Sequence, residues 1–82
     1  MIATWNLGQS APKIRGTHKA GTPRRWTITV RAEHDGTVER MTIRADKPCT
    51  LHDLHDLVMG ELGEFKARVG EFTGLWWQAV AR

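Results

Sequence analysis

Residues 26–45 constrain the fold more strongly than any other part of the chain. They read WTITVRAEHDGTVERMTIRA, which is two runs of alternating apolar and polar residues on either side of Asp35-Gly36. Asp-Gly is a preferred pair for the two-residue type I′ turn that closes a β-hairpin. Alternation over runs of this length is typical of half-buried strands. The sequence therefore predicts an antiparallel hairpin with its turn at Asp35-Gly36.

The turn also determines which residues of the two predicted strands face each other. On one face every facing pair is apolar: Val30 with Met41, Ile28 with Ile43, and Trp26 with Ala45. On the other face Arg31 lies opposite Arg40, and Arg44 lies opposite Thr27. A slip of one residue would turn every side chain to the wrong face, so this match supports the register. We therefore expect one buried apolar face and one exposed face of Thr and Arg.

Residues 50–62 are predicted to form a helix. Thr50 suits the N-cap, and Asp53 three residues later completes a pair of the capping-box type. Apolar residues then recur at the spacing of one helix face, at Leu51, Leu54, Val58 and Leu62. Gly63 fits the position just after a helix, where a left-handed residue is common. The sequence thus predicts one amphipathic helix that covers the apolar face of the hairpin.

The pattern of residues 64–72 fits two structures. The run EFKARVGEF alternates between polar and apolar residues and has a glycine at or near each end, which favours a strand. Phe65 and Val69 would also continue the apolar face of the preceding helix. We predict a strand here, and a helix remains the alternative.

The last apolar run, LWWQAV at residues 75–80, is expected to be a final strand that pairs with the preceding one. A short terminal helix is the alternative. Successive side chains of a strand point to opposite faces. If the run is extended, one of Trp76 and Trp77 therefore points into the core and the other points outward.

Residues 1–25 show no periodicity that predicts a helix or a strand. Gly, Pro, Ser and Thr are mixed with basic residues, as in LGQSAPKIRGTHKAGTP, and this composition is typical of extended segments and loops. We therefore expect an extended basic N-terminal arm over 1–25 and a single small domain over 26–82. The domain is predicted to be a two-layer α+β fold, with a hairpin (about 26–45) packed on one helix (about 50–62) and one or two C-terminal strands.

Size and composition fit one folded domain. The chain has 82 residues, of which 40% are hydrophobic and 26% charged, as in globular proteins. Its single cysteine excludes an intramolecular disulfide, and the chain does not open on the basic and apolar regions of a secretory signal. The longest apolar run is too short to span a bilayer. We therefore expect a protein of the cytoplasm, or of the interior of a virion, without membrane contact.

The doubled tripeptide HDL raises the question of a metal site or a catalytic cysteine. Cys49, His52 and His55 stand at even spacing, and both residue types bind zinc. A structural zinc site needs four ligands, and the sequence has no second cluster of Cys and His. A catalytic cysteine needs a base, an orienting group and an oxyanion pocket, for which a domain with one helix has little room. We therefore expect no enzyme activity, no cofactor and no metal, with these three residues as weak metal candidates.

Positive charge gathers in the first part of the chain. Residues 1–32 contain six basic side chains and no acidic one, whereas residues 45–82 contain six acids. The exposed hairpin face and the arm together offer Arg31, Arg40, Arg44, Lys13 and Arg15. Such a cluster fits the phosphates of a nucleic acid. The aromatic side chains of a single-strand platform are missing from the predicted hairpin face, so nucleic-acid binding is the alternative function.

The tryptophans favour a protein partner. One member of the Trp76-Trp77 pair is expected to point outward, Trp5 lies in the arm, and tryptophan is enriched among the residues that carry most binding energy at interfaces. We therefore predict a non-enzymatic protein–protein interaction module that contacts its partner through Trp5, Trp76, Trp77, Arg24 and Arg25. It would be a small subunit of a larger phage-like or bacterial assembly, a homo-oligomer, or a small inhibitor of a larger complex.

Overall fold

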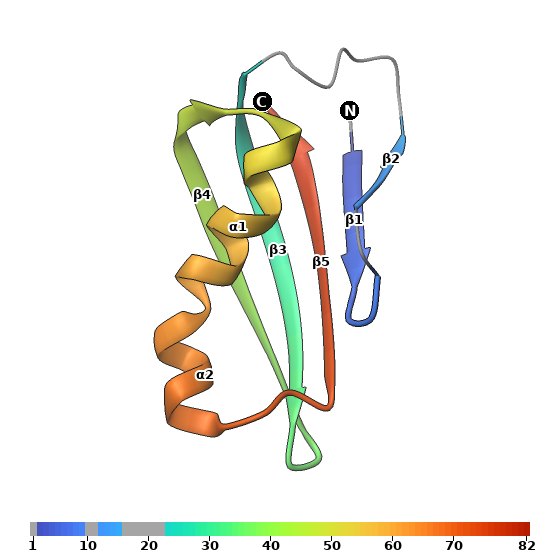
Figure 1. The fold of residues 1–82 in the computed structure, drawn as a ribbon, viewed down its shortest axis with the longest axis vertical. Coiled ribbons are helices and arrows are strands. Elements are labelled where there is room, and N and C mark those ends of the chain that lie inside the picture. Colours follow the sequence, from blue (N-terminus) through green and yellow to red (C-terminus); the bar gives the residue numbers. More distant parts are fainter. Residues whose placement is uncertain (1, 10–11, 16–22) are drawn as a thin grey trace.

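A computed structural model describes residues 2–9, 12–15 and 23–82, except for the side chain of His52. The chain forms five strands and two short helices (Figure 1). Their bounds are β1 Ile2–Asn6, β2 Lys13–Arg15, β3 Arg24–His34, β4 Thr37–Cys49, α1 Leu51–Glu61, α2 Gly63–Val69 and β5 Gly74–Ala81. This arrangement confirms the predicted α+β class.

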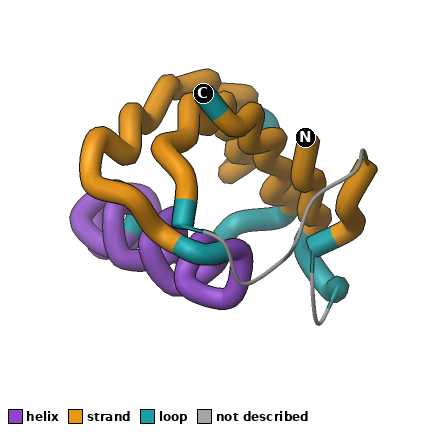
Figure 2. Tube along the Cα trace, turned by 90° about the horizontal axis from the view of Figure 1, so that it is seen from above, coloured by secondary structure: helices purple, strands orange, loops and turns teal. Residues whose placement is uncertain are grey.

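The strands form one antiparallel sheet in the order β2-β1-β5-β3-β4. Both helices lie along the same face of this sheet, beside β3 and β4, so the domain has two layers (Figures 1 and 2). Within the described ranges, no helix covers the opposite face. One broad surface of the sheet is therefore left to the side chains of the strands alone.

The hairpin of β3 and β4 has the predicted turn and register. Asp35 and Gly36 both have positive φ, at 49° and 76°, as the type I′ turn requires. Every expected facing pair is present, from Arg31 with Arg40 to Trp26 with Ala45. β4 is an edge strand, a position in which a strand tolerates a residue such as Pro48 that lacks a backbone N–H.

Strand β1 lies within the segment predicted to be an arm, and it docks on the domain itself. It pairs with β5, so that Ile2 faces Val80 and Asn6 faces Trp76. Its alternate residues Ala3 and Trp5 are buried in the core. The paired residues are 70 to 78 positions apart in the sequence, which is why the local pattern of this short strand did not reveal the pairing.

Helix α1 begins and ends where the sequence predicts, with Thr50 at the N-cap and Leu62 at the C-cap. The predicted capping box is not formed: no cap side chain bonds a backbone N–H, and the Thr50 hydroxyl instead donates to Asp53 Oδ2 over 2.9 Å. The apolar face is buried as expected, through Leu51, Leu54, Val58 and Leu62. Leu62 is the C-cap of α1, with φ −84°, so Gly63 is the residue just after the cap, as expected. Gly63 does not have a positive φ, and helix α2 begins at this residue.

The predicted strand over 64–72 was wrong, because helix α2 takes up Gly63–Val69. The alternating positions Phe65 and Val69 are four residues apart, so they also share a helix face, and Phe65 is buried in the core. Helix α2 ends at Gly70, whose φ of 85° is accessible to glycine at little cost. Strand β5 therefore pairs with β1 and β3 instead of with this segment.

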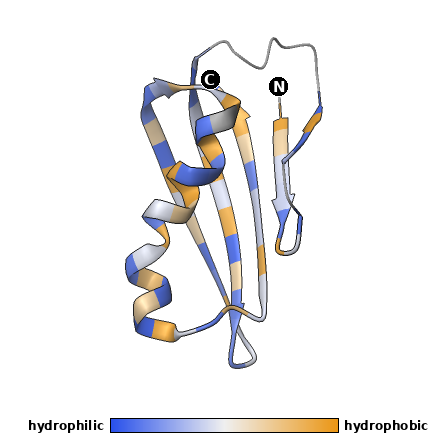
Figure 3. Cartoon of the chain, in the orientation of Figure 1, coloured by the Kyte–Doolittle hydropathy of each residue, from blue (hydrophilic) through white to orange (hydrophobic). Residues whose placement is uncertain are grey.

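The core fills the space between the sheet and the helices. Its largest fully buried side chains come from β3, β5 and α1 and include Trp26, Trp77, Ile28, Leu54 and Val58. Along β3, apolar and polar residues alternate as one face turns inward and the other outward (Figure 3). The core thus fixes which strand residues remain on the uncovered face.

Candidate functional site

The uncovered face of the sheet, which we call the open face, presents side chains from all five strands. The strand registers align them in four rows, because facing residues of antiparallel strands share a face. The rows are Arg15-Ile2-Val80-Thr27-Arg44, Lys13-Thr4-Gln78-Thr29-Thr42, Asn6-Trp76-Arg31-Arg40 and Gly74-Glu33-Val38, each read toward β4. Glu33 is thus a carboxylate on this face, next to the row of Arg31. This surface is built from segments that lie at both ends of the sequence and in its middle.

The five basic residues singled out as the nucleic-acid alternative all lie on the open face. They are Lys13 and Arg15 on β2, Arg31 on β3, and Arg40 and Arg44 on β4. All five side chains are exposed. The sequence placed three of them together on the hairpin, and the structure adds the two from the predicted arm.

These five charges lack acidic partners in the described part of the chain. The ion pairs found there join His34 to Glu39, Lys66 to Glu71 and Arg82 to Asp46, and none includes a member of the cluster. Arg31 and Arg40 directly face each other, and facing like charges destabilise a strand pair. A bound anion would relieve this repulsion.

Asp46 is an acidic residue close to this surface, and it is already engaged. Arg82 donates to its carboxylate over 2.9 Å. This hydrogen bond, together with the charges of Arg82, Arg44 and Arg25, lowers the pKa of the Asp46 carboxyl. The end of the sheet near Arg44 therefore keeps a positive surface despite the carboxylate.

Trp76 lies at the centre of the open face. It faces Asn6 on β1 and Arg31 on β3, and it is half-buried. The Arg31 guanidinium lies 5.6 Å from the centroid of the indole ring, within the range of a cation–π contact. The hairpin itself carries no aromatic residue on this face, as expected, but β5 lies between β1 and β3 and brings Trp76 into the basic cluster.

Two hollows flank Trp76. One, of about 360 Å³, is lined by Ile2, Thr4, Lys13, Arg15, Trp76 and Gln78. The other, of about 270 Å³, is lined by Asn6, Arg31, Glu33, Gly74 and Trp76 among others. The first hollow combines an aromatic ring, polar groups that form hydrogen bonds, and two cations. Thr4 and Gln78 were missed by the sequence reasoning because their proximity depends on the pairing of β1 with β5.

Two of the three tryptophans predicted to contact a partner are core residues in the structure. Trp77 is 0% exposed and Trp5 is 5% exposed. Trp5 stacks on Trp77 with a centroid distance of 6.4 Å, and its ring lies 4.9 Å from that of His55. Their burial removes both from the accessible surface and leaves Trp76 as the one member of that set on the open face.

Arg24 and Arg25 are exposed, but they begin β3, whereas Arg31 lies six residues further along the strand. The carbonyl oxygen of Arg25 accepts a hydrogen bond from the backbone N–H of Arg82 over 2.8 Å. Arg25 thus belongs to the end of the sheet around Asp46, and neither residue lies beside Trp76.

The structure describes two side chains of the Cys/His set, Cys49 and His55. No group of three metal-binding side chains gathers in the described part of the chain. Cys49 ends β4, where its carbonyl oxygen accepts a hydrogen bond from Trp26 Nε1 over 3.1 Å, and burial raises the pKa of its thiol. The ring of His55 packs against Trp5. The side chain of His52 lies outside the described part of the structure.

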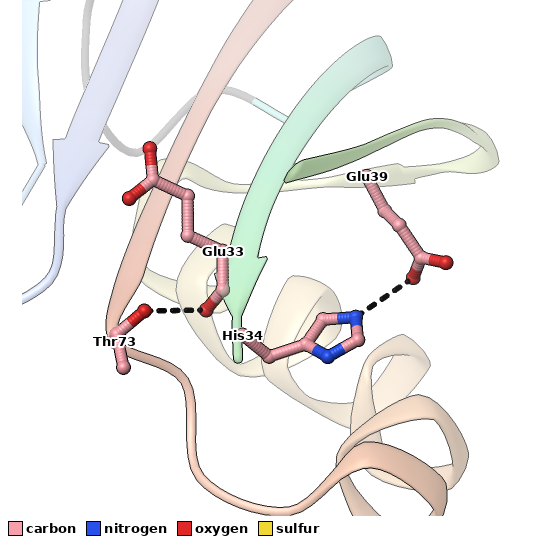
Figure 4. Close-up of polar contacts among 4 residues, drawn as sticks. All are labelled: Glu33, His34, Glu39 and Thr73. Atoms are coloured by element: carbon pink, nitrogen blue, oxygen red, sulfur yellow. Dashed lines mark hydrogen bonds and ion pairs between the residues drawn. The ribbon is translucent and has the colours of Figure 1, made fainter. Parts of the chain in front are cut away.

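Polar contacts join the hairpin end to the segment before β5 and link β3 to β4 (Figure 4). The Thr73 hydroxyl donates to the carbonyl oxygen of Glu33 over 3.2 Å, and His34 Nε2 lies 3.3 Å from Glu39 Oε2. The His34 ring also meets Phe65 edge-on at 5.6 Å. These contacts fix the lower end of β3 and β5, and with it the position of Trp76 on the sheet.

The helix side of the molecule is less suited to an anion. A hollow of about 690 Å³ lies between β4 and the helices. Its lining includes Glu39, Glu61, Glu64 and Arg68, and also Arg40, which lies on the edge strand β4 and so borders this hollow as well as the open face. A polyanion is therefore favoured on the open face and repelled from this hollow.

Comparison of the chain with protein-family models, with curated proteins and with solved structures found no match. In the described part of the chain, neither helix is long and apolar enough to cross a membrane.

Proposed function

We propose that the protein is a non-enzymatic binding module and that its open face binds nucleic acid. The observation that carries this proposal is the position of Trp76 among five exposed basic side chains without acidic partners. Basic side chains neutralise phosphates and release counterions, which supplies affinity without regard to sequence. An aromatic ring among them adds a surface on which a base can stack.

The same structure weakens the support for a protein partner. That prediction depended on Trp5 and on an outward tryptophan as spare anchors, and Trp5 lies in the core. An acidic protein surface remains the second candidate, in an assembly or as the target of an inhibitor. It is favoured by the apolar side chain of Val80, 43% accessible, which faces Ile2 on β1 and lies in the same row as Arg15 and Arg44.

The proposed site of action is the cytoplasm or the interior of a virion, where nucleic acid is abundant. The single cysteine is consistent with a reducing compartment, because it cannot form an intramolecular disulfide.

Fluorescence anisotropy with a labelled mixed-sequence DNA strand tests the proposal. We expect binding at low salt that weakens steeply as salt rises. Reversing two charges, with Arg31→Glu and Arg40→Glu together, should abolish it. The matched control is Lys66→Glu together with Arg68→Glu on α2, in the helix layer, which should retain most of the affinity.

Two results would contradict the proposal. One is the absence of binding by the unmodified protein at low salt. The other is equal loss of affinity in both double variants, which would mean that only net charge matters. Binding of an acidic protein that is insensitive to salt, without binding of DNA, would favour the second candidate.

A further inference from the structure

We propose that the ligand of the open face is a single strand, and that one of its bases stacks on Trp76 in the hollow bounded by β1, β2 and β5. This inference rests on the proposed function and specifies its ligand. A single strand differs from a duplex because its bases are free to leave the stack and meet an aromatic side chain. Trp76 is the side chain of the open face that can receive one.

The contacts of Trp76 leave part of its ring available. Arg31 lies over the ring and lines only the smaller hollow. The larger hollow, of about 360 Å³, also borders Trp76, but its lining does not include Arg31. A base that enters the larger hollow therefore meets the indole away from the guanidinium. Arg31 holds the ring in place and adds positive charge behind it.

The other walls of the larger hollow suit a base and its phosphate. The Gln78 amide and the Thr4 hydroxyl, which face each other across β1 and β5, can both donate and accept hydrogen bonds. Such groups can pair with the exposed edge of a base. Lys13 and Arg15 form the rim on β2, where they can hold the phosphates on either side of that base.

The remaining cations extend the site across the sheet. Arg40 and Arg44 lie on β4, at the opposite edge from Lys13 and Arg15 on β2. Four strand spacings of about 4.8 Å separate these edges, or about 19 Å. A strand that crosses the sheet can therefore meet phosphate-binding groups before and after Trp76. A duplex is read by a helix or ribbon that enters a groove, and the open face offers a sheet surface instead.

Abasic DNA separates the contribution of base stacking from that of phosphate binding. Anisotropy is measured with three labelled probes of about 12 nucleotides: a thymidine strand, a strand with the same phosphates but no bases, and a duplex. We expect the thymidine strand to bind about tenfold more tightly than the abasic strand, because one stacked base contributes about that much. It should also bind more tightly than the duplex.

Variants then test the role of Trp76. Trp76→Ala should remove the preference for the base-bearing strand and leave affinity for the abasic strand within about twofold, whereas Trp76→Phe should retain most of the preference. Val80→Ala, on the same strand and face, is the matched control and should keep it. Thermal melting checks that each variant folds. If Trp76→Ala does not fold, the comparison of the three probes with the unmodified protein still tests the inference.

The outcomes distinguish the inference from the proposed function. Equal affinity for the thymidine and abasic strands, or tighter binding of the duplex, overturns the inference and leaves phosphate binding by the open face intact. A preference that survives in folded Trp76→Ala also overturns it. Failure of all three probes to bind overturns both.

Discussion

The number of unpaired basic side chains on the open face sets the expected salt dependence of nucleic-acid binding. Five such residues face the ligand: Lys13, Arg15, Arg31, Arg40 and Arg44. Each phosphate contact with a single strand contributes about −0.7 to the slope of log K against log salt, so five contacts give about −3.5. A rise from about 50 to about 200 mM salt should then weaken binding about 100-fold.

Single substitutions test which basic residues contribute to the salt dependence. Arg44→Ala and Lys13→Ala, at opposite edges of the sheet, should each reduce the slope by about 0.7. Lys66→Ala removes the same charge from α2, where Lys66 pairs with Glu71 over 3.7 Å, and should leave the slope unchanged. Anisotropy titrations at four or more salt concentrations provide the slopes. An equal change of slope in all three variants, or a slope near zero in the unmodified protein, would contradict the proposed phosphate contacts of the open face.

Further predictions concern the framework of the site. Leu54→Ala empties a fully buried position and should lower the free energy of unfolding by about 2–5 kcal/mol in urea titrations. Gly70→Ala, at φ 85°, should cost about 1–3 kcal/mol in the same assay. Because the pKa of Asp46 is lowered in the folded state, its pairing with Arg82 stabilises the fold above about pH 4. This stabilisation is lost as pH falls through the folded-state pKa. The melting temperatures of Asp46→Asn and of the unmodified protein should therefore converge in acid. The same variant should bind DNA more tightly. Cys49, whose thiol pKa is raised by burial, should react with iodoacetamide more slowly than free cysteine near neutral pH.

The parts of the fold that the sequence could predict depend on local chemistry. Asp35-Gly36 has a strong turn preference, and the strands beside it pair with each other, so their register followed from counting. Helix α1 was equally local, with its cap and apolar face inside about a dozen residues. Helix α2 was missed because the spacing of Phe65 and Val69 satisfies both a strand and a helix, and the decision came from packing on α1 and the sheet.

The site was only half predictable for a related reason. The basic residues of the hairpin were placed correctly on one face, since their register is local. Trp76 joined them only through the pairing of β5 with β1 and β3, which brings together residues from opposite ends of the chain. The same pairing buried Trp5, which the composition of the N-terminal segment had suggested was exposed. The order of strands that are distant in the sequence therefore determines which side chains lie together on the open face.

A two-dimensional ¹H–¹⁵N NMR titration with the thymidine strand tests the central claim most directly, because it reports every backbone amide and all four indole N–H groups at once. We expect the indole signal of Trp76 and the amides of β1, β5 and β3 to shift most, while those of α1 and α2 stay nearly unchanged. Shifts concentrated in the helices, or an indole signal of Trp76 that does not move at saturation, would contradict this expectation.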